Sequence, residues 1–146
     1  MRVASIGATL FILKGILKMC LVKSKVHTKE FRKEAPKIVT VWKVLLVRND
    51  RWFSPYRCTD NAIKPGEWLL SNRRWYHRWQ ERLGTVHNGI HVYLDENWAR
   101  CYAIGNSTNL ILVECTARRK DFVSCCYSKR HAVFTKILIP KQPDWQ

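Results

Sequence analysis

The chain has 146 residues, which is enough for one domain with a single core and too few for two independent ones. Its hydrophobic fraction of 47% and its seven tryptophans exclude it from the intrinsically disordered class, which requires low hydrophobicity. Its net charge of +15, from 26 basic and 11 acidic residues, indicates a surface that attracts anions.

The first 18 residues contain an apolar run that Lys14 interrupts. The run is too short and too charged for a transmembrane helix, and no small-residue cleavage site follows it. Ile6, Leu10, Leu13 and Leu17 recur at helical spacing, which predicts an amphipathic helix. We therefore expect a leader or amphipathic helix that caps the core, binds a partner or touches an anionic membrane.

Residues 19–37 form a basic stretch, which we expect to be a flexible spacer whose Lys23 and Lys25 contact phosphates. Residues 1–37 hold nine basic residues and two acidic ones, nearly half of the net charge in a quarter of the chain. The segment MCLVKSKVHTKEFRKEAPKIVTVWKVLLV, from Met19, resembles the opening of small proteins of gut bacteria and their phages that carry no known activity. This resemblance implies that translation begins at Met19 and that residues 1–18 do not belong to the natural protein.

From residue 38 the pattern becomes that of strands. Residues 37–50, KIVTVWKVLLVRND, alternate and then run apolar, which predicts a long strand with a turn at Asn49-Asp50. A short strand or edge follows in RWFSPYR, because Pro55 cannot donate within a sheet. Pro65-Gly66 then marks a turn, and residues 67–83 fit either a short strand with a loop or a helix.

The second half of the chain alternates strands with one helix. TVHNGIHVYL predicts a strand opened by a kink at Gly89. DENWARCYAIG predicts a helix over 95–104, with Asp95 as its N-cap and Gly105 as its stop. NLILVECTA predicts a central strand, and DFVSCCY and HAVFTKILIP predict two more, the last ended by Pro140.

Together these elements predict an α+β fold, a single domain over 38–140 with a mostly antiparallel sheet, followed by a tail over 141–146. The six cysteines show no disulfide framework, and three of them lie in apolar segments where free cysteine behaves as a small buried residue: Cys101, Cys115 and Cys125. Free thiols favour a reducing cytoplasm. No pair of ligands has zinc-site spacing, so we expect no metal.

The most basic stretch is RRWYHRWQER, residues 73–82. As a helix it places Trp75 and Trp79 on one face, toward the core, and leaves a row of arginines on an adjacent face. Together with RRK at 118–120, this row is expected to contact phosphates. The predicted polyanion-binding residues are Arg73, Arg74, Arg78, Arg82, Arg118, Arg119, Lys120, Lys23 and Lys25.

Residues 89–117 carry GIHVY, then ARCY, then LILVECTA, an order that resembles the core of the ADP-ribosyltransferase fold in poly-ADP-ribose polymerases. That family has a GIYFA strand, a helix with SxxYC and a LLLCEVALG strand. The resemblance implies a nucleotide pocket at His91, Tyr93 and Tyr102 with NAD or ADP-ribose as ligand, and His91 replaces a tyrosine that stacks on nicotinamide. The family's catalytic glutamate is missing from the late strand HAVFTKILIP, which implies an inactive or divergent member.

Enzyme activity has little support in the sequence. No phosphate-binding glycine loop, nucleophile elbow or metalloprotease motif occurs, and His87 or His91 beside Glu114 or Asp95 would supply only a general base. We expect a non-enzymatic protein that needs no cofactor and binds nucleic acid or another polyanion. Two alternatives stay open: a divergent ADP-ribosyltransferase-like nucleotide-binding domain, and a phage-encoded protein that docks on an acidic partner. The oligomeric state is open as well.

Overall fold

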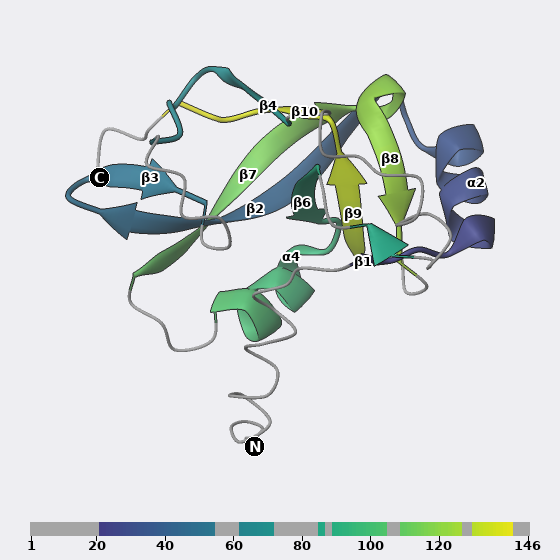
Figure 1. The fold of residues 1–146 in the computed structure, drawn as a ribbon, viewed down its shortest axis with the longest axis horizontal. Helices are drawn as coiled ribbons and strands as arrows, with labels where there is room; N and C mark the ends of the chain where they lie inside the picture. The colour runs from purple at the N-terminus through teal and green to yellow at the C-terminus, as the bar shows by residue number, and fades with distance from the viewer. Residues whose placement is uncertain are drawn as a thin grey trace.

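The computed structural model describes residues 21–54, 62–71, 85–86, 89–104, 109–126 and 130–141. Its larger sheet contains β2 (Ile38–Arg48), β3 (Arg51–Phe53), β4 (Trp68–Leu70), β6 (Ile90–Tyr93), β7 (Leu110–Arg118), β8 (Phe122–Cys125), β9 (His131–Phe134) and β10 (Lys136–Leu138). The strand order is β4-β10-β7-β2-β6-β9-β8, with β3 paired to β2 (Figure 1). A second, small sheet pairs β1 (Leu21–Val22) with β5 (Thr85–Val86). All strand pairs are antiparallel, so the expected α+β fold with a mostly antiparallel sheet is confirmed.

The long ladder between β2 and β7 forms the middle of the sheet. It runs from the pair Ile38 and Arg118 to the pair Leu46 and Leu110. The predicted turn after β2 is confirmed, since Asn49 and Asp50 both have positive φ, 52° and 61°. Two left-handed residues in a row match the twist of a two-residue hairpin, which lets β3 return along β2.

A helical segment covers one face of this ladder. The helix α4 (Glu96–Trp98) continues as a π-helix over Ala99–Ile104. The predicted N-cap is confirmed, because the Asp95 side chain accepts a hydrogen bond from the Trp98 N–H at 2.9 Å. Cys101, expected to be buried, is exposed. A π-helix has a wider turn than an α-helix, so residues spaced for one α-helical face no longer share it.

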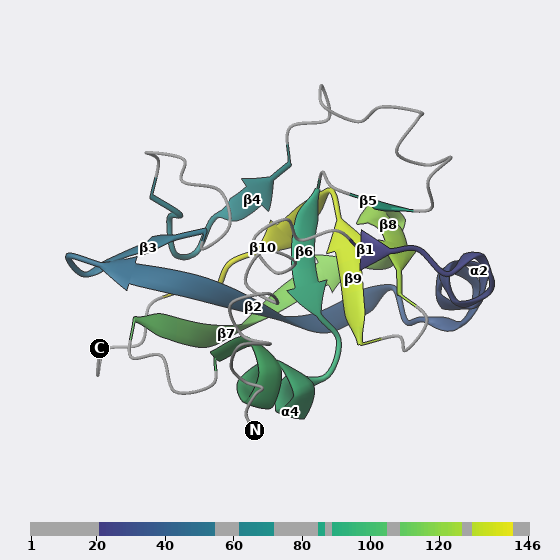
Figure 2. The ribbon, with the colours of Figure 1, turned by 60° about the horizontal axis from the view of Figure 1, so that its bottom comes forward.

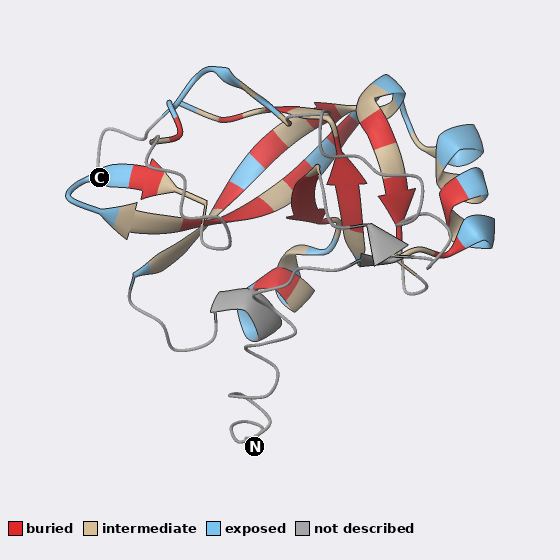
Figure 3. Ribbon diagram, viewed as in Figure 1, coloured by how far each residue is buried: buried red, intermediate tan, exposed pale blue. Residues whose placement is uncertain are grey.

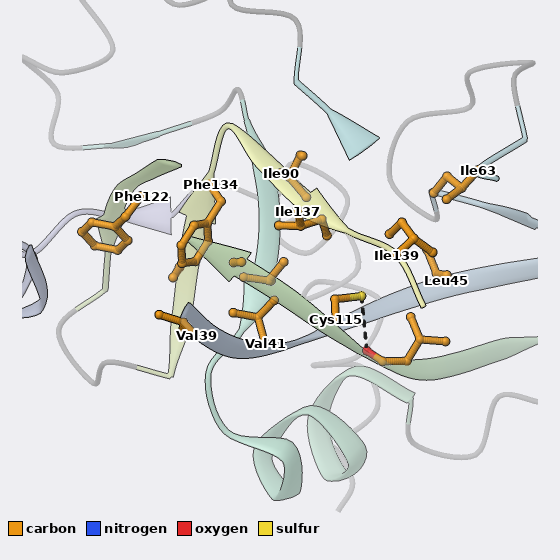
Figure 4. Close-up of a cluster of buried hydrophobic side chains, with 14 of the residues drawn as sticks. Val39, Val41, Leu45, Ile63, Ile90, Cys115, Phe122, Phe134, Ile137 and Ile139 are labelled. Atoms are coloured by element: carbon orange, nitrogen blue, oxygen red, sulfur yellow. Dashed lines mark hydrogen bonds between the residues drawn. The ribbon is translucent and has the colours of Figure 1, made fainter. Parts of the chain in front are cut away.

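The expected strand HAVFTKILIP is two strands, β9 and β10, that meet at Thr135. The Thr135 N–H donates to the Asp121 carbonyl at 2.8 Å, and its own carbonyl accepts from the Ser71 N–H at 2.9 Å. Because β9 pairs with β6 while β10 pairs with β7, the chain wraps around the end of the sheet (Figure 2). Phe134 and Ile137, on either side of this bend, are fully buried on the inner face (Figure 4).

A kink precedes β6, as the sequence predicted. Gly89 has a φ of +105°, and a Cβ atom there would lie 2.4 Å from Cγ1 of Val133. Only glycine fits both the backbone conformation and this contact. The kink separates β5, in the small sheet, from β6 in the large one.

Residues 25–34, expected to be part of a flexible spacer, are instead the helix α2 (Lys25–Glu34), and that expectation was wrong. The Ser24 side chain caps the helix by accepting from the His27 N–H at 3.2 Å. Thr28 is buried and accepts from the Cys125 N–H, while the Phe31 ring stacks on Phe122 with centroids 4.2 Å apart. Figure 3 shows this buried side of α2 against β8 and the exposed side away from it. The Thr28 hydrogen bond and the Phe31 stacking therefore attach the helix to β8, and the Ser24 cap fixes its start.

Several predicted features lie outside the described residues. These are the leader over 1–18, the stretch 72–84 that holds RRWYHRWQER, and the tail after Lys141. Of the ambiguous segment 67–83, residues 68–70 form a strand. Among the described helices, none combines the length and the apolar character that crossing a bilayer requires.

Candidate nucleic-acid interface

Five basic side chains surround one hollow of about 500 Å³ at the end of the sheet where β7 meets α2. We call this the basic edge; it comprises Arg32, Lys37, Arg118, Arg119 and Lys120. Ile38 and Phe122 complete the lining. In Figure 1 the turn after β7 lies at the top of β8, next to the C-terminal end of α2.

Backbone pairing brings these segments together. Ile38 opens β2 directly opposite Arg118, the last residue of β7, so the residues before β2 and after β7 are neighbours. The Arg119 N–H donates to the Lys37 carbonyl at 2.9 Å, and the Arg119 guanidinium donates to the Ala35 carbonyl at 2.7 Å. A short 3-10 helix, Arg119–Asp121, then turns the chain into β8. The basic edge is therefore built from segments about 80 residues apart in the chain.

Each arginine of the basic edge makes one side-chain hydrogen bond or ion pair with the described part of the chain. Arg32 donates to the Val123 carbonyl at 2.8 Å, and Arg118 pairs with the Asp121 carboxylate at 2.9 Å. A guanidinium has five N–H donors, so one such contact positions it and leaves most donors for a ligand. The two lysines, Lys37 and Lys120, are exposed. The hollow thus combines three oriented arginines with two solvated lysines.

The positive surface continues onto the edge of the sheet at β4 and β10. Trp68 is 39% exposed, and its ring faces two cations: the Arg118 guanidinium at 4.6 Å and the Lys136 ammonium at 4.8 Å from the ring centroid. A second hollow of about 460 Å³ is lined by Arg118, Lys120, Lys136 and their neighbours. Asp121 is the carboxylate at this second hollow, and it is bonded to Arg118.

The predicted polyanion-binding residues are only partly brought together. Arg118, Arg119 and Lys120 lie at the basic edge as one unit. Lys25 is the first residue of α2, about 10 Å from Arg32 along the helix axis, and Lys23 precedes the N-cap. The four arginines of 73–82 lie outside the described residues. Arg32 and Lys37 were predicted only as part of the segment 23–37, which was expected to supply phosphate contacts, and not as individual site residues; Arg32 lies in the basic last turn of α2.

The residues of the implied nucleotide pocket are packed against each other. His91 and Tyr93 are each 8% exposed, and Nδ1 of His91 lies 3.3 Å from Nε2 of His131. The Tyr93 ring stacks on His131 with centroids 5.2 Å apart. Burial, with a smaller contribution from the Lys43 charge, lowers the pKa of His131 to about 4, so its imidazole is neutral at neutral pH. The Tyr102 side chain lies outside the described part of the chain.

Asp95 and Glu114 were the two carboxylates considered as partners of a histidine general base. Asp95 caps the helical segment, and Glu114 is exposed on β7 opposite Trp42. His87 is not among the described residues. Within the described ranges no group of three or more histidine, cysteine or acidic side chains is placed to hold a metal ion.

Comparison with models of protein families, with curated proteins and with solved structures finds no match to this chain.

Proposed function

We propose that this protein binds nucleic acid, non-enzymatically, through the basic edge. The observation that carries the proposal is the convergence of five cations from α2, the link to β2 and the turn after β7 around one hollow. Phosphate oxygens satisfy several arginine donors at once, and the release of counterions from nucleic acid makes such contacts favourable. The contacts run to the backbone, so we expect affinity with little sequence preference.

The arrangement of the arginines supports a polyanion rather than a purely structural role. One acceptor holds each of the three arginines in place. All three line the same hollow beside the two exposed lysines, and each guanidinium has further N–H groups that a phosphate could accept from. The net charge of +15 adds long-range attraction for any polyanion. Free thiols at Cys101 and Cys115 favour a cytoplasmic location, where nucleic acid is accessible.

The test is fluorescence anisotropy with labelled single-stranded and duplex DNA at about 50 mM salt, repeated at higher salt. We expect Lys37→Glu with Lys120→Glu to weaken binding about tenfold or more, because two phosphate contacts become repulsive. The matched control is Lys64→Glu with Lys141→Glu. It makes the same change of net charge at two exposed residues that do not line the hollow of the basic edge. Both lysines of each pair are exposed, so neither variant should disturb the fold.

Equal weakening by the two double variants would show that net charge alone drives binding and would remove the basic edge from the proposal. No binding by the wild-type chain at low salt would reject nucleic acid altogether. In that case an acidic protein partner, captured through the same cations in nuclease-treated extract and lost in the Lys37→Glu, Lys120→Glu variant, becomes the better explanation of the basic edge.

A further inference from the structure

The inner face of the sheet holds a further cavity, of about 520 Å³, that shares no described lining residue with the hollow at the basic edge. Its wall is mainly apolar and includes Ile63, Trp68, Leu69, Ile90 and Ile139. Figure 4 shows Ile63, Ile90 and Ile139 on this inner face. Cavities of this size and character are typical of sites for small molecules.

Among the described lining residues three carry charged side chains; Lys43 is buried, and Lys64 and Glu67 are exposed. Lys43 lies on β2 between Val41 and Leu45, at a strand position whose neighbours on the same face are core residues. It is 4% exposed and lines the cavity. The alternation of β2 would place an aliphatic residue here, and the chain places an ammonium instead.

The strand pairing along one edge of β2 is interrupted at Lys43. β6 pairs with β2 at Trp42 and Tyr93, and β3 takes over the same edge of β2 from Leu46 onward. Between these pairings the His91 carbonyl accepts a hydrogen bond from Nζ of Lys43, at 3.1 Å. Lys43 therefore bridges the gap between two strands with one of its three N–H groups.

The Lys43 charge has no carboxylate partner in the described part of the chain, where the two salt bridges join Arg100 to Glu96 and Arg118 to Asp121. Two titratable groups that interact electrostatically with Lys43 are neutral at neutral pH. Burial raises the pKa of the Cys115 thiol on β7 to about 12, and His131 on β9 has its pKa lowered to about 4. Lys64 and Glu67 are exposed at the rim of the cavity. A buried ammonium without a counter-ion is costly, and an anion in the cavity would remove that cost.

We propose that this cavity binds a small organic anion, with its carboxylate or phosphate on the Lys43 ammonium and its apolar body against Ile63, Ile90 and Ile139. The hydrogen bond to His91 holds the ammonium in place before the ligand arrives. The apolar walls exclude water from the ion pair, which strengthens it.

The test uses anilinonaphthalene sulfonate, an aromatic anion that fluoresces in apolar sites, titrated at about physiological salt to screen the basic edge. We expect saturable binding that Lys43→Met weakens about tenfold or more, because one buried ion pair is lost. Lys29→Met removes the same charge from an exposed residue of α2 that does not line the cavity, and it should change the affinity less than about twofold. Competition by phenylacetate and by phenyl phosphate, with benzyl alcohol as the neutral analogue, then distinguishes a carboxylate ligand from a phosphate one.

A second measurement needs no variant. Burial lowers the pKa of Lys43 to about 8, so raising the pH from about 7 to about 9 removes its charge. Over this range Cys115 and His131 stay neutral, and the wild-type affinity for the probe should fall severalfold while that of Lys43→Met stays flat. Equal affinity of wild type and Lys43→Met, or no change of the wild-type affinity with pH, would overturn the proposal.

Discussion

The basic edge and the inner cavity both present cations, but they differ in their access to water. At the basic edge Lys37 and Lys120 are exposed, and each arginine has N–H donors beyond the one that holds it in place. In the cavity Lys43 is enclosed by apolar side chains and has one carbonyl as acceptor. The first arrangement costs little stability and suits a large, exposed polyanion; the second costs stability and suits a ligand small enough to enter.

This difference shows why a count of charges does not locate a site. All 26 basic residues contribute to long-range attraction, but only those whose backbone positions converge can share one ligand. The strand pairing of β2 with β7 creates the basic edge, and the divergence of β2 from β6 creates the gap at Lys43. The following variants change the core beneath both regions, two buried titratable side chains, or the basic edge.

The largest expected effect breaks the core beneath both regions. Phe134 is fully buried, with its ring 5.5 Å from that of Phe122 and 6.2 Å from that of Phe31. We expect Phe134→Ala to lower the free energy of unfolding by about 3–5 kcal/mol, measured by urea denaturation, and to weaken both kinds of ligand binding. Val26→Ala, at a residue that is 66% exposed, is the control and should stay within about 0.5 kcal/mol of wild type.

The next effect is on the pH dependence of stability. The pKa of His131 is about 4 in the folded protein, against its usual 6.5, so the unfolded chain binds more protons between these values. Stability should therefore be lost as the pH falls from about 6.5 to about 4, by up to about 3 kcal/mol from this residue. His131→Phe keeps a ring against Tyr93 without a titrating proton, and its stability should fall less over this range. Parallel curves for the two proteins would contradict the prediction.

Lys43→Met tests the cost of the buried charge. The pKa of Lys43 falls from 10.5 to about 8 because burial disfavours its charged form, so wild-type stability should rise as the pH increases from about 8 to about 10.5. At pH 7 we expect the variant to be more stable by about 1–2 kcal/mol, after the loss of the hydrogen bond to His91. Lys120→Met, at the basic edge, should change stability by less than about 0.5 kcal/mol. A destabilised Lys43→Met would show that the hydrogen bond outweighs the cost of burial.

The smallest expected effect sharpens the description of the basic edge. Asp121→Asn removes the carboxylate bonded to Arg118, an ion pair whose side chains are 28% and 14% exposed. We expect a loss of about 0.5–1 kcal/mol in stability and, since a cation is released, about threefold tighter DNA binding. Glu96→Gln makes the same charge change in an exposed pair with Arg100, away from the basic edge, and should leave both quantities almost unchanged. Equal gains in DNA affinity from both variants would contradict a local role for Arg118.

Local patterns in the sequence were enough to predict most of the strands and turns. Alternation and β-branched content located β2 and β7, the asparagine-aspartate pair located the hairpin turn, and Asp95 located the start of the helical segment. These features depend on residues close in the chain. The bend at Thr135 was missed because its cause, the hydrogen bonds with Asp121 and Ser71, lies in other segments.

The candidate sites were less predictable. RRK at 118–120 was found as a charge cluster, but its partners Arg32 and Lys37 are about 80 residues away and meet it only through the first pair of the β2 and β7 ladder. Helix α2 was missed because its low content of apolar residues is typical of a solvated segment, and its two anchors matter only once β8 is beside them. Lys43 was passed over as one polar residue in a strand.

By itself the sequence determined the fold class, the positive charge and the approximate positions of most strands and turns, because these follow from composition and from contacts between near neighbours. Only the tertiary structure decided which cations share a ligand and which one is buried, because desolvation and convergence depend on strands that meet from distant parts of the chain. The same side chain, lysine, is exposed at position 120 and buried at position 43.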